Sequence, residues 1–238
     1  MRAYEVLKKF NSNPDAVNNF NKTGTFGMRN ELYQEILRRN GLFDKNMKIL
    51  DVACGKGMLI RDWPYKVKHG IDLVGHEEFT KNNPNSVLFE CDLNEGLPSS
   101  VLRNRYDIVF LMDIIEHLFS IDALMEDVSK ILKKNGRIFV TLGNDGFYVN
   151  RIKMLLFGTY IDQEDTYQQA HLRFFTVKQF AASLTKRGFD VAELGGYNLA
   201  RFDNRWSLLN FIPFRKFLSR RFPGFFATNL YILARKRK

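Results

Sequence analysis

The sequence predicts an α/β fold in which a mostly parallel sheet of seven strands is covered by helices on both faces. Short apolar runs alternate with segments of helical periodicity along most of the chain, which is typical of strand–helix–strand units. The run 108–112 is apolar without a break, which indicates a strand buried on both faces. Hydrophobic residues make up 45% of the 238 residues, enough for the core that such a sheet needs.

The strands are the first elements that the pattern predicts. Seven segments have their length and apolar character: residues 48–53, 67–72, 87–93, 106–112, 137–142, 190–194 and 229–234. The segment 67–72 is the weakest of them, and the glycine-rich turn after 48–53 marks that strand as buried.

The helices are predicted from their end signals and inward stripes. Gly41 and Gly188 stop helices over 29–40 and 176–187. Ser120 can cap a helix that has acids early, lysines as late as Lys134, and Gly136 at its end. A further helix is expected to start at Gly57.

Composition divides the chain into four parts. Residues 1–44 form an N-terminal loop or lid and a helix, because 11–27 is rich in Asn, Gly and Thr. Residues 45–200 form the α/β core. Residues 201–228 form a basic, aromatic helical insertion, and 229–238 hold the last strand and a basic tail.

The net charge of +10 is concentrated at one end of the chain. Residues 201–238 hold ten Lys and Arg and one acid, which gives 10 − 1 = +9. This distribution argues against a nucleic-acid-binding surface spread over the fold, and suits an acidic partner or a membrane surface. The aromatic and basic segment 206–226 predicts either peripheral contact with an anionic membrane or a subdomain that packs on the sheet.

Location is indicated by what the sequence lacks. Cys54 and Cys91 fit neither a zinc pattern nor a disulfide framework, which favours a reducing compartment. No apolar signal segment begins the sequence, and no stretch is long enough to span a membrane. We expect a cytoplasmic protein, and membrane contact through 206–226 would place it at the inner face of the membrane.

A turn rich in small residues follows the first strand. Ala53, Gly55 and Gly57 would let a ligand approach the backbone closely. Asp51 at the strand end can accept from an ammonium group, and a helix starting at Gly57 would offer N–H groups to a carboxylate. An amino-acid ligand carries both charges. A dinucleotide site would need a third glycine where Ile60 stands, so the turn favours S-adenosylmethionine over NAD.

Acids also end the next two strands. Asp72 follows the second strand, where a carboxylate can hold two ribose hydroxyls. Asp92 ends the third strand, where a carboxylate can accept from an adenine amino group. Carboxylates at three successive strand ends indicate one ligand site at that edge of the sheet.

These residues, together with the D-x-x-E-H signature formed by Asp113, Glu116 and His117, resemble the class I S-adenosylmethionine-dependent methyltransferases, small-molecule branch. The resemblance covers residues 45–145 and departs at Ala53, where the family more often has glycine. It implies a Rossmann-like fold with S-adenosylmethionine as cofactor. The implied cofactor-binding residues are Asp51, Ala53, Gly55, Gly57, Asp72, Leu73, Cys91, Asp92, Leu93, Met112 and Asp113.

A narrower resemblance concerns the acceptor. The run 171–176 and the ending 222–227 are similar to methyltransferases of bacterial surface-glycan gene clusters. They imply a sugar or glycan substrate, with Arg173 and Asn144 as candidate substrate-binding residues.

A hydroxyl acceptor needs a base within hydrogen-bond reach. His171 is the leading candidate, because it follows the acidic stretch 162–165 and precedes Arg173, which could hold an anionic group. His171 could instead only order its loop. His117 is the rival base, although in the family the pair of Glu116 and His117 more often shapes the pocket. No cluster has metal-site spacing, so no metal is expected.

The sequence therefore predicts a methyltransferase acting on a sugar or glycan intermediate, at a hydroxyl, by in-line displacement. Methylation of a quinone-like or other small apolar acceptor is the alternative, suggested by the phenylalanines of the C-terminal part. A binding protein that keeps the fold without turnover is a second alternative. A small molecule or glycan is the expected partner, and nucleic acid is not.

Overall fold

The computed structural model describes residues 25–159, 171–197 and 212–237. The predicted lid before Thr25, the acidic stretch 162–165, and the first part of the segment 206–226 lie outside the described residues.

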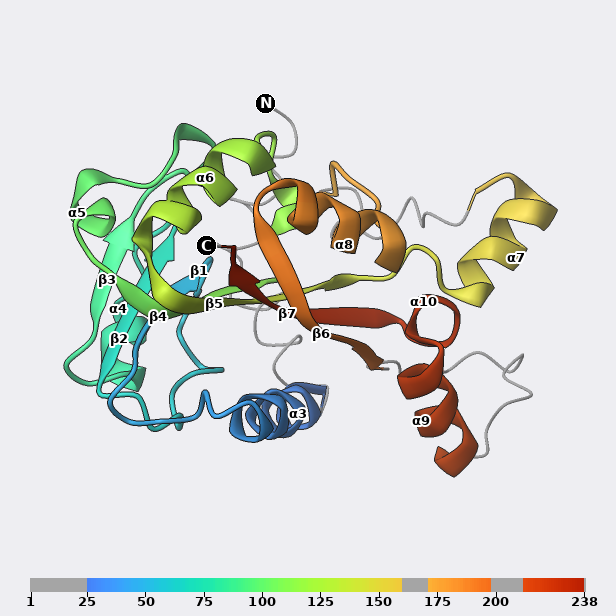
Figure 1. Cartoon of the computed structure of the whole chain (residues 1–238), viewed down its shortest axis with the longest axis horizontal. Coiled ribbons are helices and arrows are strands. Elements are labelled where there is room, and N and C mark those ends of the chain that lie inside the picture. The colour runs from blue at the N-terminus through green and yellow to red at the C-terminus, as the bar shows by residue number, and fades with distance from the viewer. Residues whose placement is uncertain (1–24, 160–170, 198–211, 238) are drawn as a thin grey trace.

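A seven-stranded sheet forms the centre of the molecule (Figure 1). Its strands are β1 (Lys48–Val52), β2 (Val67–Asp72), β3 (Val87–Glu90), β4 (Tyr106–Met112), β5 (Leu132–Gly143), β6 (Phe189–Tyr197) and β7 (Asn229–Lys236). They lie in the order β3-β2-β1-β4-β5-β7-β6. The pairs among β1–β5 are parallel, and β7 runs antiparallel to both β5 and β6. The predicted mostly parallel sheet is confirmed, and its strand order reverses between β1 and β4, where ligands bind in such folds.

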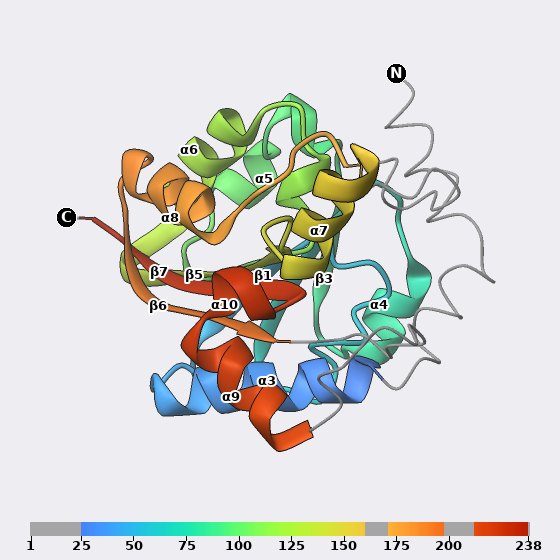
Figure 2. The same ribbon diagram turned by 90° about the vertical axis from the view of Figure 1, so that its right-hand side faces the viewer.

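Helices cover both faces of this sheet (Figures 1 and 2). They are α3 (Thr25–Arg39), α4 (Glu77–Asn82), α5 (Ser99–Leu102), α6 (Ile121–Ile131), α7 (Tyr148–Phe157), α8 (Val177–Lys186), α9 (Ile212–Arg221) and α10 (Pro223–Phe226), with short 3-10 turns η1 (Leu93–Glu95) and η2 (Ile115–His117). Helices α3 and α4 lie on one face and α5, α6 and α8 on the other. Helices α9 and α10 come just before β7, as the predicted insertion does.

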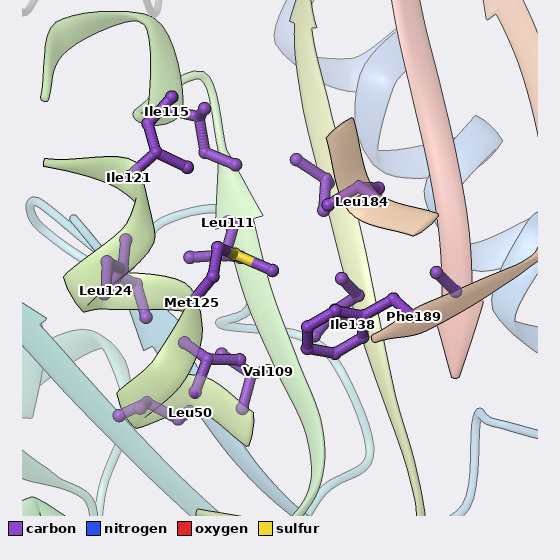
Figure 3. Packing of buried hydrophobic residues seen from close by; sticks show 14 of the residues in the cluster. Leu50, Val109, Leu111, Ile115, Ile121, Leu124, Met125, Ile138, Leu184 and Phe189 are labelled. Carbon is purple, nitrogen blue, oxygen red and sulfur yellow. The ribbon is translucent and has the colours of Figure 1, made fainter. Parts of the chain in front are cut away.

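Side chains of alternate residues in the central strands point into two separate hydrophobic cores, one on each face of the sheet. Leu50, Val109 and Ile138 face α6 and α8, where Figure 3 shows Met125 lying against β4. The intervening residues face α3 and the segment before β2. Because each fully buried side chain of this size contributes roughly 1.5–3 kcal/mol, the two cores hold the central strand ends in place.

The predicted helix at Gly57 is wrong. Gly57 has φ +65°, outside the helical region, and the chain makes only turns from Ala53 to Asp62. Pro64 disfavours a helix at the preceding residue, and the Trp63 indole is held by the Asn30 side chain of α3 at 2.6 Å. The link from β1 to β2 therefore has no helix N-terminus to offer a ligand carboxylate.

The predicted end of the helix at Gly136 is also wrong, because α6 stops at Ile131 and β5 begins at Leu132. Leu132 pairs with Tyr106 of β4, and a register shift follows before Ile108. Lys133 then lies in the strand, with its Nζ 2.7 Å from Asp107. Strand pairing thus overrides the helical charge pattern of this stretch.

Candidate functional site

The turn after β1 is shaped by left-handed backbone. Ala53, Gly55 and Gly57 have φ of +60°, +51° and +65°. A Cβ on Gly57 would lie 2.6 Å from the Phe79 ring, whereas a Cβ on Gly55 would meet nothing within 4 Å. Gly57 is therefore needed for the close approach to α4, and Gly55 leaves open space at the strand end.

Asp72 lies across from this turn at the end of β2. Its carboxylate accepts from the backbone N–H groups of Gly55 at 2.7 Å and Leu73 at 2.8 Å. The side chain is buried, and burial raises the pKa of Asp72 above its usual range. Asp72 thus ties the first turn to the second strand and turns an oriented carboxylate toward the pocket.

Asp51 is the other buried carboxylate of this edge. Its Oδ1 is buried and has no hydrogen-bond partner among the described residues. Burial, with a smaller contribution from the Asp72 charge, raises the pKa of Asp51 to about 8. An unsatisfied buried acceptor is costly, so this atom is suited to a ligand that brings a hydrogen-bond donor.

A pocket lies beside these carboxylates, at the carboxyl ends of the strands. It is lined by Ala53, Asp72, Leu73, Cys91, Asp92, Leu93, Asn94, Ile114, His117, Leu118 and Phe119. The lining includes six of the eleven residues predicted to bind the cofactor, together with one of the two candidate bases.

Asp92 caps the short turn η1, since its Oδ1 accepts from the Asn94 backbone N–H at 2.9 Å. Burial raises the pKa of the Cys91 thiol to about 11, so it forms a neutral wall of the pocket. Asn94, which the sequence analysis did not single out, joins the two sides of the pocket by accepting from the Phe119 N–H at 2.8 Å. Its position two residues after the strand-end acid was the available signal.

Asp113 lies at the end of β4 in a left-handed conformation, with φ +51°. Its carboxylate pairs with Arg29 of α3 at 2.7 Å and accepts from the Thr141 hydroxyl at 2.9 Å. These bonds join α3, β4 and β5 at the site edge. Asp113 and its half-buried neighbour Met112 do not line the pocket.

The two candidate bases lie in contact. The imidazole rings of His117 and His171 are 4.7 Å apart between centroids, in an edge-to-face arrangement. The Leu172 N–H donates to the Glu116 carbonyl at 2.8 Å, which fixes the segment after His171 against η2. Of the two rings, that of His117 lines the pocket.

Glu116 completes this cluster. Burial, and then the nearby Asp113 charge, raise its pKa. One ligand atom from each of Glu116, His117 and His171 lies within 4.8 Å of the others. Among the residues that the structure describes, these three side chains could hold a metal ion. The spacing in the sequence did not reveal it, because His171 comes from a distant segment.

The two candidate substrate residues make bonds to the protein backbone. Arg173 donates to the carbonyls of Leu118 at 3.3 Å and Phe119 at 2.6 Å, and so supports the pocket wall. Asn144 is buried, and its amide donates to the carbonyls of Pro223 and Ala227. Neither side chain lines the pocket, so their role toward substrate stays a prediction.

These features fit S-adenosylmethionine. The buried acceptor oxygen of Asp51 suits an ammonium group, and the oriented carboxylate of Asp72 suits the two hydroxyls of a ribose. Leu93 and Ile114 offer an apolar wall for an adenine ring. The expected contact of a ligand carboxylate with a helix N-terminus does not fit, because no helix begins at Gly57.

Comparison with known proteins agrees with this fit. Residues 27–194 match a family model described as a methyltransferase domain. A ubiquinone biosynthesis O-methyltransferase of Pelagibacter ubique is 28% identical over 182 residues, which cover 70% of this chain and 71% of the relative. Another protein of that description, from Rickettsia typhi, is 24% identical and covers 89% of this chain and 90% of its own.

A solved structure shares this fold. The 1,6-didemethyltoxoflavin-N1-methyltransferase of Burkholderia thailandensis, with bound S-adenosylhomocysteine, superposes with a TM-score of 0.63 at 13% identity. The alignment covers 100% of this chain and 89% of that protein.

Proposed function

Since the chain belongs to the methyltransferase-domain family and is an S-adenosylmethionine-dependent methyltransferase, we propose that it methylates a phenolic hydroxyl of a quinone-like acceptor. The observation that carries this proposal is the His117 imidazole, which lines the pocket beside the strand-end carboxylates and lies against the His171 ring. The sugar or glycan acceptor expected from the run 171–176 finds no support among the named relatives, which favour the quinone-like alternative.

The cofactor would be held by the first three strand ends. Asp51 would accept from its ammonium group, Asp72 from its ribose hydroxyls, and Asp92 from its adenine amino group. When bound, S-adenosylmethionine supplies an electrophilic methyl group on a positively charged sulfur. Asp72 is already oriented by two backbone N–H groups, so little ordering is needed on binding.

His117 is the proposed base, and His171 the residue that positions it. The acceptor O–H bond breaks as the new O–C bond forms and the C–S bond of the methyl donor breaks. The hydroxyl proton passes to an imidazole nitrogen of His117. The edge-to-face contact with His171 restricts the orientation of that ring.

The acidity of the acceptor favours a phenol over a sugar. A phenolic hydroxyl, with a pKa of about 10, is acidic enough for an imidazole base to take up its proton as the methyl group is transferred. An aliphatic sugar hydroxyl is far less acidic, so the same base would help it much less. The apolar side chains of Leu118 and Phe119 also offer a surface to an aromatic ring.

The experiment is an acceptor panel with methyl-labelled S-adenosylmethionine and the full chain. Prenylated dihydroxybenzenes form one arm, and nucleotide sugars and oligosaccharides form the other. We expect label only in the first arm, at a phenolic oxygen located by mass spectrometry. Label in the sugar arm alone would contradict the proposed phenolic acceptor and support the sugar or glycan acceptor predicted from the sequence.

A further inference from the structure

Helix α7 has no buried residue, although half of its side chains are large and apolar. Leu155 is 84% exposed, and its neighbours Leu156 and Phe157 are 65% and 72% exposed. A helix of ten residues is marginal in water unless its apolar side is covered. The sequence analysis predicts no helix over this stretch.

Among the described residues, the ring contacts of helix α7 lie near its start. The Tyr148 ring stacks on Phe225 of α10 at 5.8 Å, and the Arg151 guanidinium lies 5.5 Å from the centre of the same ring. Figure 1 shows the rest of α7 projecting beyond the sheet. The three residues of its last turn therefore form an apolar tip.

Further exposed apolar side chains lie on α9 and just before α10. Phe214 and Phe217 of α9 are 55% and 59% exposed, and Phe222 is 50% exposed. In Figure 2 the three helices face the viewer together, with α10 between α7 and α9. We call this surface the docking face, defined by Leu155, Leu156, Phe157, Phe214, Phe217 and Phe222. Exposed apolar side chains gathered on one side of the molecule, unlike residues scattered singly over it, indicate an interaction site.

The charged residues in the sequences of α7, α9 and α10 are all basic. Residues 148–158 contain Arg151 and Lys153 and no acid. Residues 212–227 contain four basic residues and no acid. Exposed aromatic and aliphatic side chains interleaved with basic ones are the composition of segments that lie in the headgroup region of anionic membranes.

The docking face lies at the same edge of the sheet as the pocket. Strands β4 and β5 are parallel and end together, with Met112 opposite Thr141, and α7 follows β5 directly. Helix α10 leads into β7, whose Asn229 lies opposite Gly143 at that edge. A lipid-embedded acceptor would thus reach the pocket without crossing the sheet.

We propose that the docking face binds an anionic phospholipid surface, with the tip of α7 inserted among the headgroups. No helix in the described part of the chain is long and apolar enough to cross a bilayer. The proposed contact is peripheral. It extends the sequence prediction for 206–226 to a helix that the sequence did not single out, and it does not depend on the identity of the acceptor.

Co-sedimentation of the full chain with vesicles tests this proposal. Phosphatidylcholine vesicles with phosphatidylglycerol should bind the protein at low salt, and vesicles of phosphatidylcholine alone should bind it at least tenfold less. The double variant Leu155→Glu/Phe157→Glu should lower binding to the anionic vesicles at least tenfold. The matched control is Val87→Glu, since Val87 is 43% exposed on the edge strand β3, away from the docking face; its binding should equal that of the wild type.

Calorimetry with S-adenosylhomocysteine keeps this test separate from the proposed function. The α7 double variant should bind it with wild-type affinity, because neither residue lines the pocket. Equal binding of the wild type and the double variant to the anionic vesicles would contradict the proposal that the docking face binds them. So would a dimer in solution that the double variant abolishes while neither protein binds vesicles, since a second copy would then be the occupant.

Discussion

At the scale of single residues, Asp51 is a buried carboxylate at the end of β1. Burial, with the charge of Asp72, raises its pKa to about 8, and one of its oxygens has no partner among the described residues. For an acid whose folded pKa is raised, the folded state holds its proton longer than the unfolded state does. The stability contributed by the protonated form is thus greatest below the ordinary pKa of about 4 and is lost as pH rises toward 8.

The same shift predicts pH-dependent cofactor binding. A bound ammonium group favours the ionised form of Asp51, so binding releases a proton and the affinity rises between pH 6 and about 7.5. Calorimetry of S-adenosylhomocysteine in buffers of different ionisation enthalpy measures the release. The Asp51→Asn variant should lose both the proton release and the pH slope. The control Asp92→Asn should bind more weakly with the slope kept, and a slope that persists in Asp51→Asn would assign it to another group.

The two histidines predict different kinetic defects. His117→Ala should lower kcat about 10²–10⁴-fold, because it removes the proton acceptor. His171→Ala should lower kcat less, because it removes only the ring that restricts His117. Both should keep wild-type affinity for S-adenosylhomocysteine, which controls for misfolding. The pH profile of kcat decides between them: its acidic limb should vanish in His117→Ala and remain in His171→Ala, and the reverse result would make His171 the base.

At the scale of elements, Asn144 joins the end of β5 to α10. Its side chain accepts from the Gly146 N–H at 3.0 Å and donates to the carbonyls of Pro223 and Ala227. Asn144→Ala should therefore lower the free energy of unfolding by roughly 2–3 kcal/mol, since it leaves buried polar groups unsatisfied. Urea denaturation measures this loss.

The control for Asn144 is Asn104→Ala. The half-buried Asn104 side chain donates to the Ser100 carbonyl at 2.7 Å and accepts from Lys48 Nζ at 2.6 Å; because these bonds lie nearer the surface, its loss should cost less than that of Asn144. If Asn144→Ala instead unfolds like the wild type but loses acceptor binding, the substrate role predicted from the sequence would be restored.

Local signals predicted some elements closely. Strands β2 and β4 have the predicted bounds, and Thr176 caps α8 with a full capping box, ended by left-handed Gly188. These features depend on neighbours in the chain. The turn after Gly57 and the start of β5 at Leu132 depend on tertiary contacts instead, which is why periodicity and charge order misjudged them.

At the scale of the whole molecule, the sheet gathers the site at one edge. The strand-end carboxylates could be predicted because parallel strands bring their carboxyl ends together. The contact of Glu116 and His117 with His171 could not, because it depends on how the segment before α8 packs on η2. The exposed tip of α7 lies outside the sequence prediction, which places no helix over 148–157.

The central claim is that this edge binds S-adenosylmethionine through its oriented carboxylates. The most direct measurement is calorimetric titration of the full chain with S-adenosylhomocysteine, in the wild type and in Asp72→Ala. We predict one site per chain in the wild type, with affinity lowered in Asp72→Ala by roughly 1–3 kcal/mol through the lost ribose contacts. Absence of binding by the wild type, or equal affinity in both proteins, would contradict the claim.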